Sequence, residues 1–256
     1  GTGGNLLPGP LSVHAGLAGT TSRFVTALAA LGPGPYTIDG HPPLRTRPMG
    51  PLHDALGALG ATISHGEEQG RLPVTVSGPL RHADALMLPG DVSSQFVTAM
   101  MLIGPYIPGG LELWLSSPVG SRPYLEITRS VMAAFGATDV EIRDRHVHVG
   151  PGEYLATEFD VEPDASSASY PLAAAAMVGG AVVVRGRGAE SVQGDARFVD
   201  VLAEMGCLVT RSARDTVVMR RRDAPLRGID IDMADISDLV PTLSVVAAQA
   251  VPPTRI

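Results

Sequence analysis

The sequence predicts an α/β protein assembled from copies of one strand–helix unit. A polar cluster followed by an apolar run occurs four times, at intervals of about 73 residues. A second phrase, with proline near its start and glycine just after its end, lies between successive clusters. Repeats of this length are stacked supersecondary units whose neighbours bury a shared core. These two periodic features indicate the fold class.

Each polar cluster predicts the start of a helix. Hydroxyl and carboxylate side chains accept hydrogen bonds from the first free N–H groups of a helix, and a segment rich in Ala, Leu and Val follows each cluster. Helix N-termini also attract anions, because their unpaired N–H groups and their dipole both favour negative charge. The pattern therefore predicts a ligand that carries phosphate or carboxylate. The clusters lie at residues 20–24, 93–96, 166–170 and 235–238.

The second phrase predicts a further helix in three of the units. Proline just inside the start of a helix and glycine just past its end is the usual asymmetry of helix termini. An alternating or apolar stretch follows each glycine and predicts a strand. Each unit therefore reads strand, helix, strand, helix and a final pair of strands. The three copies span residues 47–60, 122–136 and 195–206, the last without the proline, and the strands begin near residues 61, 140 and 208.

Composition bounds the class of protein. With 256 residues and 45% hydrophobic content, the chain can bury substantial cores, and its length favours two domains. No apolar run approaches the roughly 20 residues that span a bilayer, and no signal-peptide pattern opens the chain, so we expect a cytoplasmic protein. The net charge of −7 argues against non-specific nucleic-acid binding. Cys207 is the only cysteine, and we expect it to be a small core residue.

The charged residues favour anion binding and offer no metal site. All 19 basic residues are arginines, whose guanidinium fork suits bidentate binding of carboxylate and phosphate. Arg47 and Arg122 are the candidates, with a solvated surface position as the alternative for each. His146 and His148 alternate with valines, as on a half-exposed strand. Because Asp, Glu and His do not cluster with ligand spacing, we expect no metal.

Two local features add to this hypothesis. Residues 15–21, Ala-Gly-Leu-Ala-Gly-Thr-Thr, form a small-residue loop before a helix, where the missing side chains let a ligand approach the backbone. Asp238 stands at the fourth polar cluster, where a carboxylate could accept a proton from a substrate hydroxyl. The alternative for Asp238 is an N-cap.

Several stretches resemble, in the same order, signature motifs of the 5-enolpyruvylshikimate-3-phosphate (EPSP) synthase family. The resemblance covers essentially the whole chain, and several motifs in order make it specific. The stretches are Gly19-Thr20, Arg45-Thr46-Arg47-Pro48, Gly90-Asp91-Val92-Ser93-Ser94-Gln95-Phe96, Ser121-Arg122-Pro123-Tyr124, Asp164-Ala165-Ser166-Ser167-Ala168-Ser169-Tyr170, Ser191-Val192-Gln193-Gly194-Asp195, and Asp232-Met233 through Asp238.

The resemblance implies the enolpyruvyl transferase fold, a two-domain inside-out α/β barrel in which each domain holds three βαβαββ units. Against the family, residues 1–160 correspond to most of the first domain and residues 161–256 to about half of the second. Both ends of the family's chain are expected to be missing, together with lysines and arginines that complete its phosphate sites. We therefore expect this chain alone to be inactive.

The implied activity is that of a 3-phosphoshikimate 1-carboxyvinyltransferase, which joins shikimate 3-phosphate to phosphoenolpyruvate and releases phosphate without a metal or organic cofactor. The expected partners are these two small molecules, with no nucleic acid and no membrane, and the full-length protein is expected to be a monomer. Asp238 would accept the 5-hydroxyl proton. The residues implied to hold shikimate 3-phosphate are Ser93, Ser94, Gln95 and Ser121, with Tyr124 packing nearby, and those implied to hold phosphoenolpyruvate are Gly19, Arg47 and Gln95.

Two positions depart from the family pattern, and two other interpretations stay open. Leu17 replaces Asn in the small-residue loop and Phe24 replaces Pro after the arginine, so the phosphoenolpyruvate side is expected to be reshaped. The related UDP-N-acetylglucosamine enolpyruvyl transferase shares the fold, but its cysteine loop is missing, because Cys207 lies on another element. A non-catalytic phosphate-ligand binding module would bind shikimate 3-phosphate without turnover.

Overall fold

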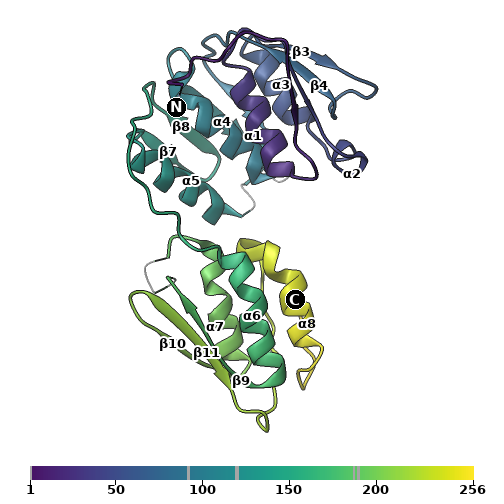
Figure 1. Ribbon diagram of the computed structural model, residues 1–256, viewed down its shortest axis with the longest axis vertical. Coiled ribbons are helices and arrows are strands. Elements are labelled where there is room, and N and C mark those ends of the chain that lie inside the picture. Colours follow the sequence, from purple (N-terminus) through teal and green to yellow (C-terminus); the bar gives the residue numbers. More distant parts are fainter. Residues whose placement is uncertain (1, 91–92, 119–120, 187, 189–190) are drawn as a thin grey trace. The chain divides into compact units, whose positions relative to one another are not determined.

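The computed structural model describes residues 2–256 apart from 91–92, 119–120, 187 and 189–190 (Figure 1). The chain separates into two compact units, Gly1–Glu158 and Phe159–Ile256, and each unit has its own hydrophobic core. The sequence predicts a domain boundary between residues 160 and 161. That the two units are most of one family domain and about half of another stays a prediction.

The first unit opens with one complete copy of the repeat. Its sheet has the strand order β1-β2-β4-β3, with β1 and β2 parallel and the other neighbours antiparallel. Parallel strands need a crossover connection, and α1 supplies it. The elements are β1 (Leu11–His14), α1 (Gly19–Ala29), β2 (Tyr36–Asp39), α2 (Pro42–Arg45), α3 (Gly50–Ala58), β3 (Thr62–His65) and β4 (Val74–Ser77).

A second copy with the same topology completes the first unit. Its strand order is β5-β6-β8-β7, again with one parallel pair followed by two antiparallel pairs. The predicted order of strand, helix, strand, helix and two strands is thus confirmed twice. The elements are β5 (Leu86–Leu88), α4 (Ser94–Ile103), the 3₁₀ helix η1 (Gly104–Tyr106), β6 (Leu111–Leu115), α5 (Arg122–Ala134), β7 (Val140–Ile142) and β8 (His146–Val149).

The second unit repeats the pattern from its first helix onward. Its strands pair antiparallel in the order β10-β11-β9, which is the same sheet without its first strand. Parallel bridges join Leu226 to Ala250 and Asp230 to Arg255, as β1 joins β2, so a further copy begins there. The elements are α6 (Ala165–Val178), β9 (Gly180–Arg185), η2 (Gly194–Arg197), α7 (Phe198–Glu204), β10 (Leu208–Arg211), β11 (Asp215–Arg220), η3 (Ala234–Leu239) and α8 (Val240–Ala247).

Three of the four polar clusters lie at the start of an α-helix, and the fourth does not. Residues 235–238 form part of the 3₁₀ helix η3, and α8 begins only at Val240, with Leu239 as its N-cap. Two features explain the difference. Ile236 is buried with φ −133° and ψ 44°, which interrupts helical geometry, and Pro241 favours the first turn of the helix that follows. Asp238 is therefore not an N-cap.

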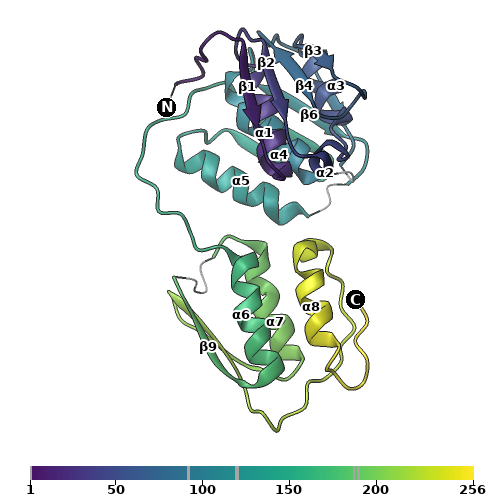
Figure 2. The same ribbon diagram turned by 45° about the vertical axis from the view of Figure 1, so that its right-hand side comes forward.

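The repeated helices pack in register. In the first unit α1 contacts α4, and α4 contacts α5 (Figure 2). The guanidinium carbon of Arg23 in α1 lies 4.8 Å from the ring centroid of Phe96 in α4. In the second unit α6 contacts α8, and Ser169 Oγ donates to Thr242 Oγ1 at 3.3 Å. These four residues are spaced 73 positions apart along the chain. The contact between neighbouring repeats therefore falls at the same position of the repeat in both units.

Other predictions concern single residues and membrane crossing. Cys207 is buried in the second core, as predicted, and burial raises the pKa of its thiol despite the nearby Arg220. Within the described ranges, none of the helices combines the length and the apolar character that crossing a bilayer requires.

Candidate functional site

Helix α1 begins at Gly19 without a side-chain cap. Its N-cap is Ala18, whose side chain cannot accept a hydrogen bond. The prediction that the hydroxyls of residues 20–24 cap this helix is wrong, because the helix starts before them. Ser22 Oγ instead donates to the Gly19 carbonyl oxygen at 2.8 Å, inside the helix. The start of α1 is therefore a helix N-terminus that no side chain of its own N-cap satisfies.

Helix α4 begins with the cap that the sequence predicts. Ser93 is the N-cap, in an extended conformation with φ −171°, and its Oγ accepts a hydrogen bond from the Gln95 backbone N–H at 3.3 Å. Ser94 is the first residue of the helix. The preceding motif residues Asp91 and Val92 lie outside the described residues.

Arg23 joins the starts of these two helices. Its Nη1 donates to Gln95 Oε1 at 2.6 Å and to Ser93 Oγ at 3.2 Å. The side chain is buried, with 8% of the residue exposed, and its guanidinium lies over the Phe96 ring. The Nε atom is buried and has no hydrogen-bond partner among the described residues.

Arg47 brings a second guanidinium to the same place. A Cβ atom built on Gly19 would lie 2.7 Å from Arg47 Nη1, so the glycine leaves room for this guanidinium beside the start of α1. Burial, and then repulsion from Arg47, lower the pKa of Arg23. The two cations thus lie close enough to repel each other. Gly19, Arg47, Ser93 and Gln95, four of the predicted ligand-binding residues, are brought together around Arg23.

In the described part of the chain, no carboxylate forms an ion pair with Arg23 or Arg47. The nearby Arg45 differs, because its Nη2 lies 2.6 Å from Asp39 Oδ2. A buried guanidinium beside a second cation is unfavourable unless an anion compensates the charge. The arrangement therefore suits an anionic ligand, held by two guanidiniums and the polar start of α4.

The other predicted residues of the first unit lie at the start of α5. Ser121 is the N-cap of α5 in the left-handed region, with φ 57°, and the Tyr124 backbone N–H donates to its carbonyl oxygen at 3.1 Å. Helix α5 packs against α4, and Thr98 and Thr128 are hydrogen-bonded between them at 3.2 Å. Arg122 donates to the Ile142 carbonyl oxygen at 3.0 Å and lies 3.5 Å from Glu126, which favours a structural role for it.

The corresponding helix start in the second unit is closed by its own carboxylate. Asp164 is the N-cap of α6 and accepts hydrogen bonds from the backbone N–H groups of Ser166 and Ser167, each at 3.1 Å. Gln193 Oε1 accepts a further bond from the Ala165 N–H at 2.8 Å. Ser166 Oγ donates to the buried Asp195. The N–H groups that an anion would bind are thus already engaged.

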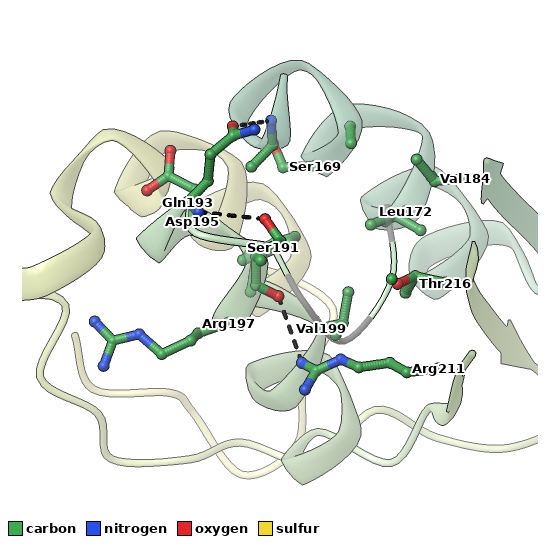
Figure 3. Close-up of a pocket in the computed structure, with 15 residues that line it drawn as sticks. Ser169, Leu172, Val184, Ser191, Gln193, Asp195, Arg197, Val199, Arg211 and Thr216 are labelled. Atoms are coloured by element: carbon green, nitrogen blue, oxygen red, sulfur yellow. Dashed lines mark hydrogen bonds between the residues drawn. The ribbon is translucent and has the colours of Figure 1, made fainter. Parts of the chain in front are cut away.

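A cavity of about 130 Å³ adjoins this closed helix start (Figure 3). Its lining includes Ser191, Gln193 and Asp195 of the predicted motif, and these polar groups hold the loop to the start of α6. Gln193 Nε2 donates to the Pro163 carbonyl oxygen at 2.9 Å, and Ser191 Oγ accepts from the Gln193 N–H at 3.3 Å. Arg211 Nη2 donates to the Ala196 carbonyl oxygen at 3.4 Å. The motif therefore has a local structural explanation.

Asp238, the predicted proton acceptor, lies in η3 and is exposed. Its neighbour Asp235 faces Arg197, with the carboxylate 3.2 Å from Nη2. Asp238 belongs to the second unit, and its role as a proton acceptor stays a prediction.

The histidines of β8 form a cluster with a carboxylate of β6. Val147 and Val149 are buried, and His146 and His148 are partly exposed, as the alternation predicts. Glu112 lies 2.7 Å from His146 Nε2 and 2.6 Å from His148 Nδ1. Burial opposes the charge on His148, but its hydrogen bond and attraction to Glu112 outweigh that effect and raise the pKa of His148. This cluster does not have the arrangement of a metal site, and neither does any other group of three or more His, Cys, Asp or Glu side chains among the described residues.

Sequence reasoning missed Arg23 as a member of the site, because it assigned that residue to a capping cluster. One signal was present. Arg23 stands 73 residues before Phe96, at a position where the repeat places helix against helix, and a charged residue there must be buried.

Comparison with known proteins identifies the chain's relatives. The sequence model of EPSP synthase (3-phosphoshikimate 1-carboxyvinyltransferase) matches residues 1–256. The 3-phosphoshikimate 1-carboxyvinyltransferase of a Nostoc species is 39% identical over 257 residues, covering 100% of this chain and 60% of that protein. The enzyme of the same name from Methanoculleus marisnigri is 41% identical over 249 residues, covering 97% and 58%. The chain therefore spans about 60% of the length of these relatives.

Solved structures show the same fold. EPSP synthase from Acinetobacter baumannii superposes with a TM-score of 0.72 at 24% identity, covering 93% of this chain and 55% of that one. The enolpyruvyl transferase NikO from Streptomyces tendae gives a TM-score of 0.58 at 23% identity, covering 79% and 49%. The predicted enolpyruvyl transferase fold is confirmed by these neighbours.

Proposed function

This chain belongs to the EPSP synthase family, and we propose that, at the length of its relatives, it acts as a 3-phosphoshikimate 1-carboxyvinyltransferase. Such an enzyme transfers the enolpyruvyl group of phosphoenolpyruvate to the 5-hydroxyl of shikimate 3-phosphate and releases inorganic phosphate. The observation that carries the proposal is the pair of guanidiniums, Arg23 and Arg47, that no carboxylate of the described residues neutralises. Both substrates are polyanions, which is the charge this pair requires.

The residues around this pair would divide between the two substrates. Arg47, beside the backbone of Gly19, would hold phosphoenolpyruvate through its phosphate or carboxylate, with Gln95 as a further donor. The hydroxyls of Ser93, Ser94 and Ser121 are short donors at the starts of α4 and α5, suited to the phosphate and hydroxyl oxygens of shikimate 3-phosphate. The Tyr124 ring would pack nearby.

The reaction would proceed by addition and then elimination. As the 5-hydroxyl oxygen bonds to C2 of phosphoenolpyruvate, Asp238 takes the hydroxyl proton and C3 gains a proton. The tetrahedral intermediate then loses a proton from C3 as the C2–O bond to phosphate breaks, which restores the double bond. The residues that hold the two anions would lower the barrier chiefly by orienting the substrates and by compensating their charge. The exposed position of Asp238 in η3 leaves its carboxylate accessible to a substrate.

The test is turnover by the protein completed to the length of its relatives, measured as phosphate release that requires both substrates. In that protein, Asp238→Asn is expected to lower kcat by about 10²–10⁴-fold, because an amide can hydrogen-bond the hydroxyl but cannot take its proton. The affinity for shikimate 3-phosphate should change little.

Asp235→Asn is the matched control, because Asp235 is an exposed aspartate of the same 3₁₀ helix. Its carboxylate faces Arg197. The kcat of this variant should stay near that of the parent. Equal turnover in the parent and Asp238→Asn would remove Asp238 from the chemistry. Binding of shikimate 3-phosphate without any turnover by the completed parent would favour the non-catalytic binding module instead.

A further inference from the structure

Arg23 contacts two of the polar side chains at the start of α4, those of Ser93 and Gln95. A single nitrogen, Nη1, donates to Gln95 Oε1 and to Ser93 Oγ. Arginine can donate hydrogen bonds but cannot accept them. Each side chain that is hydrogen-bonded to Arg23 must therefore present an acceptor atom to it. This requirement fixes which atoms of Ser93 and Gln95 face the guanidinium.

The constraint determines how the Gln95 amide is oriented. Because Arg23 holds the amide oxygen at 2.6 Å, the two N–H bonds of the same amide point away from the guanidinium. Without Arg23 the amide could turn over and present its oxygen instead, which would repel an anion. With Arg23 in place, Gln95 offers only donors to a ligand.

Ser93 is constrained in the same way. Its oxygen accepts from the Gln95 backbone N–H at 3.3 Å and from Arg23 Nη1 at 3.2 Å. A hydroxyl has two acceptor lone pairs and one O–H donor. With both lone pairs engaged, the Ser93 O–H is left to donate to a ligand.

Arg23 is itself held still. The guanidinium lies over the Phe96 ring, with its carbon 4.8 Å from the ring centroid, and only 8% of the residue is exposed. No carboxylate of the described residues competes for it, and its buried Nε makes no hydrogen bond among them. A guanidinium that stacks on a ring and is removed from water is fixed in position, and an arginine side chain stays protonated in a protein.

We propose that Arg23 is a positioning residue that turns Ser93 and Gln95 into obligate donors and so prepares the start of α4 for a phosphate-bearing anion. The choice of shikimate 3-phosphate as that anion rests on the proposed function, whereas the positioning role does not. Arg23 acts through Ser93 and Gln95, and its charge adds to the attraction exerted by Arg47.

The first measurement reads the mobility of the Gln95 side-chain amide without any ligand. The chain contains four glutamines and one asparagine, so side-chain amide signals in a ¹⁵N-labelled sample are few, and the Gln95 pair is assigned by its loss in Gln95→Ala. The steady-state heteronuclear NOE of this pair should be that of an ordered side chain in the parent. It should fall towards that of a mobile side chain in Arg23→Ala and recover in part in Arg23→Lys, which keeps a donor and a charge.

The second measurement reads affinity by calorimetric titration with shikimate 3-phosphate and, separately, with inorganic phosphate. Arg23→Ala should weaken binding of each probe by about 10- to 100-fold, the range for losing hydrogen bonds to charged groups. Arg129→Ala, which removes an exposed arginine paired with Glu126, is the control and should change neither affinity nor the Gln95 signal. Thermal midpoints of all variants report folding, and Arg23→Lys provides the test if Arg23→Ala does not fold.

A double-mutant cycle distinguishes positioning from direct contact. If Arg23 acts through Gln95, Arg23→Ala should cost much less affinity in a Gln95→Ala background than in the parent. Full additivity, or an ordered Gln95 amide with parental affinity in Arg23→Ala, would overturn the proposal. Binding of inorganic phosphate but not of shikimate 3-phosphate, with the Gln95 and Arg23 effects intact, would support the positioning role and refute the proposed substrate.

Discussion

The two units place the same helix start in opposite electrostatic surroundings. In the first unit, α1 has no side-chain cap and the start of α4 is reached by Arg23, with Arg47 nearby. In the second unit, α6 is capped by Asp164, and a second carboxylate, Asp195, accepts from Ser166. A free helix N-terminus next to cations suits an anionic ligand, whereas a self-capped one is already satisfied. The same repeat thus carries a candidate binding surface in the first unit and a helix capped by its own carboxylate in the second.

The contact between neighbouring repeats shows how the difference arises. At the same register position the first unit pairs Arg23 with Phe96, and the second pairs Ser169 with Thr242. Helices pack at this position in both cases, so the scaffold does not depend on which pair is present. Only the first pair brings a charge that reaches the helix starts. The repeat determines how the helices pack, and the residues at this position determine the charge at the helix starts.

Within this comparison of the two units, the largest expected effect comes from removing Arg47, the exposed member of the guanidinium pair. Arg47→Ala should weaken phosphoenolpyruvate binding by the completed protein by about 100-fold, because it removes charge-assisted hydrogen bonds to an anion. Arg45→Ala is the control: Arg45 lies two residues away and is already paired with Asp39 at 2.6 Å. Calorimetric titration of the three proteins compares them. Equal losses in both variants would mean that general positive charge, rather than the position of Arg47, attracts the ligand.

A second effect concerns acid and should be confined to the first unit. All seven histidines lie in residues 1–158, and burial, with repulsion from His65, lowers the pKa of His53 to about 4. Because the unfolded chain binds a proton on this histidine more readily than the folded one, its contribution to stability is present above its ordinary pKa and is lost as pH falls. Between pH 7 and pH 5 the first unit should lose about 2 kcal/mol of unfolding free energy through His53.

Trp114, the only tryptophan, lies in the first unit and reports its unfolding in urea. The pH dependence should be smaller in His53→Leu. His148 works in the opposite direction, since its raised pKa gives stability that is present at low pH and lost as pH rises through the folded value. An unchanged pH dependence in His53→Leu would show that another group causes the acid sensitivity.

The smallest expected effect is at the closed helix start. Asp164→Ala should destabilise the second unit by about 1 kcal/mol, the usual cost of losing an N-cap, and should leave phosphate affinity unchanged. Circular dichroism during urea unfolding measures the first quantity and calorimetry the second. Asp164→Asn, which keeps acceptor oxygen at the cap, should restore most of the stability. A gain of phosphate affinity in Asp164→Ala would show that the cap had been occluding a second anion site.

Most of the fold could be predicted from the sequence, because the period of about 73 residues recurs in both polar clusters and helix–glycine phrases. The prediction failed where burial overrode the pattern: Ile236 and Leu239 enter the second core, and their segment becomes a 3₁₀ helix instead of a helix start. At the site, Gly19, Arg47, Ser93 and Gln95 could be named from the resemblance to the family.

Arg23 and the closed start of α6 could not be predicted in the same way. Both depend on contacts across more than one element, namely Arg23 with Gln95 and Gln193 with Ala165. A hydroxyl-rich cluster before an apolar run has the same sequence pattern whether a guanidinium or a carboxylate contacts it in the folded structure. Pattern alone therefore locates helix starts but does not assign their charge.

The spacing of Arg23, Phe96, Ser169 and Thr242 has an evolutionary consequence. A chain that duplicates a unit without shifting its register keeps every packing contact in the new copy, so the new copy is stable before it has any task. The residues at its contact positions can then change one at a time, while the packing of the other copies stays as it was. The pair in the first unit and the pair in the second lie 146 residues apart at equivalent positions of the repeat, and they differ in charge while both helix contacts are kept.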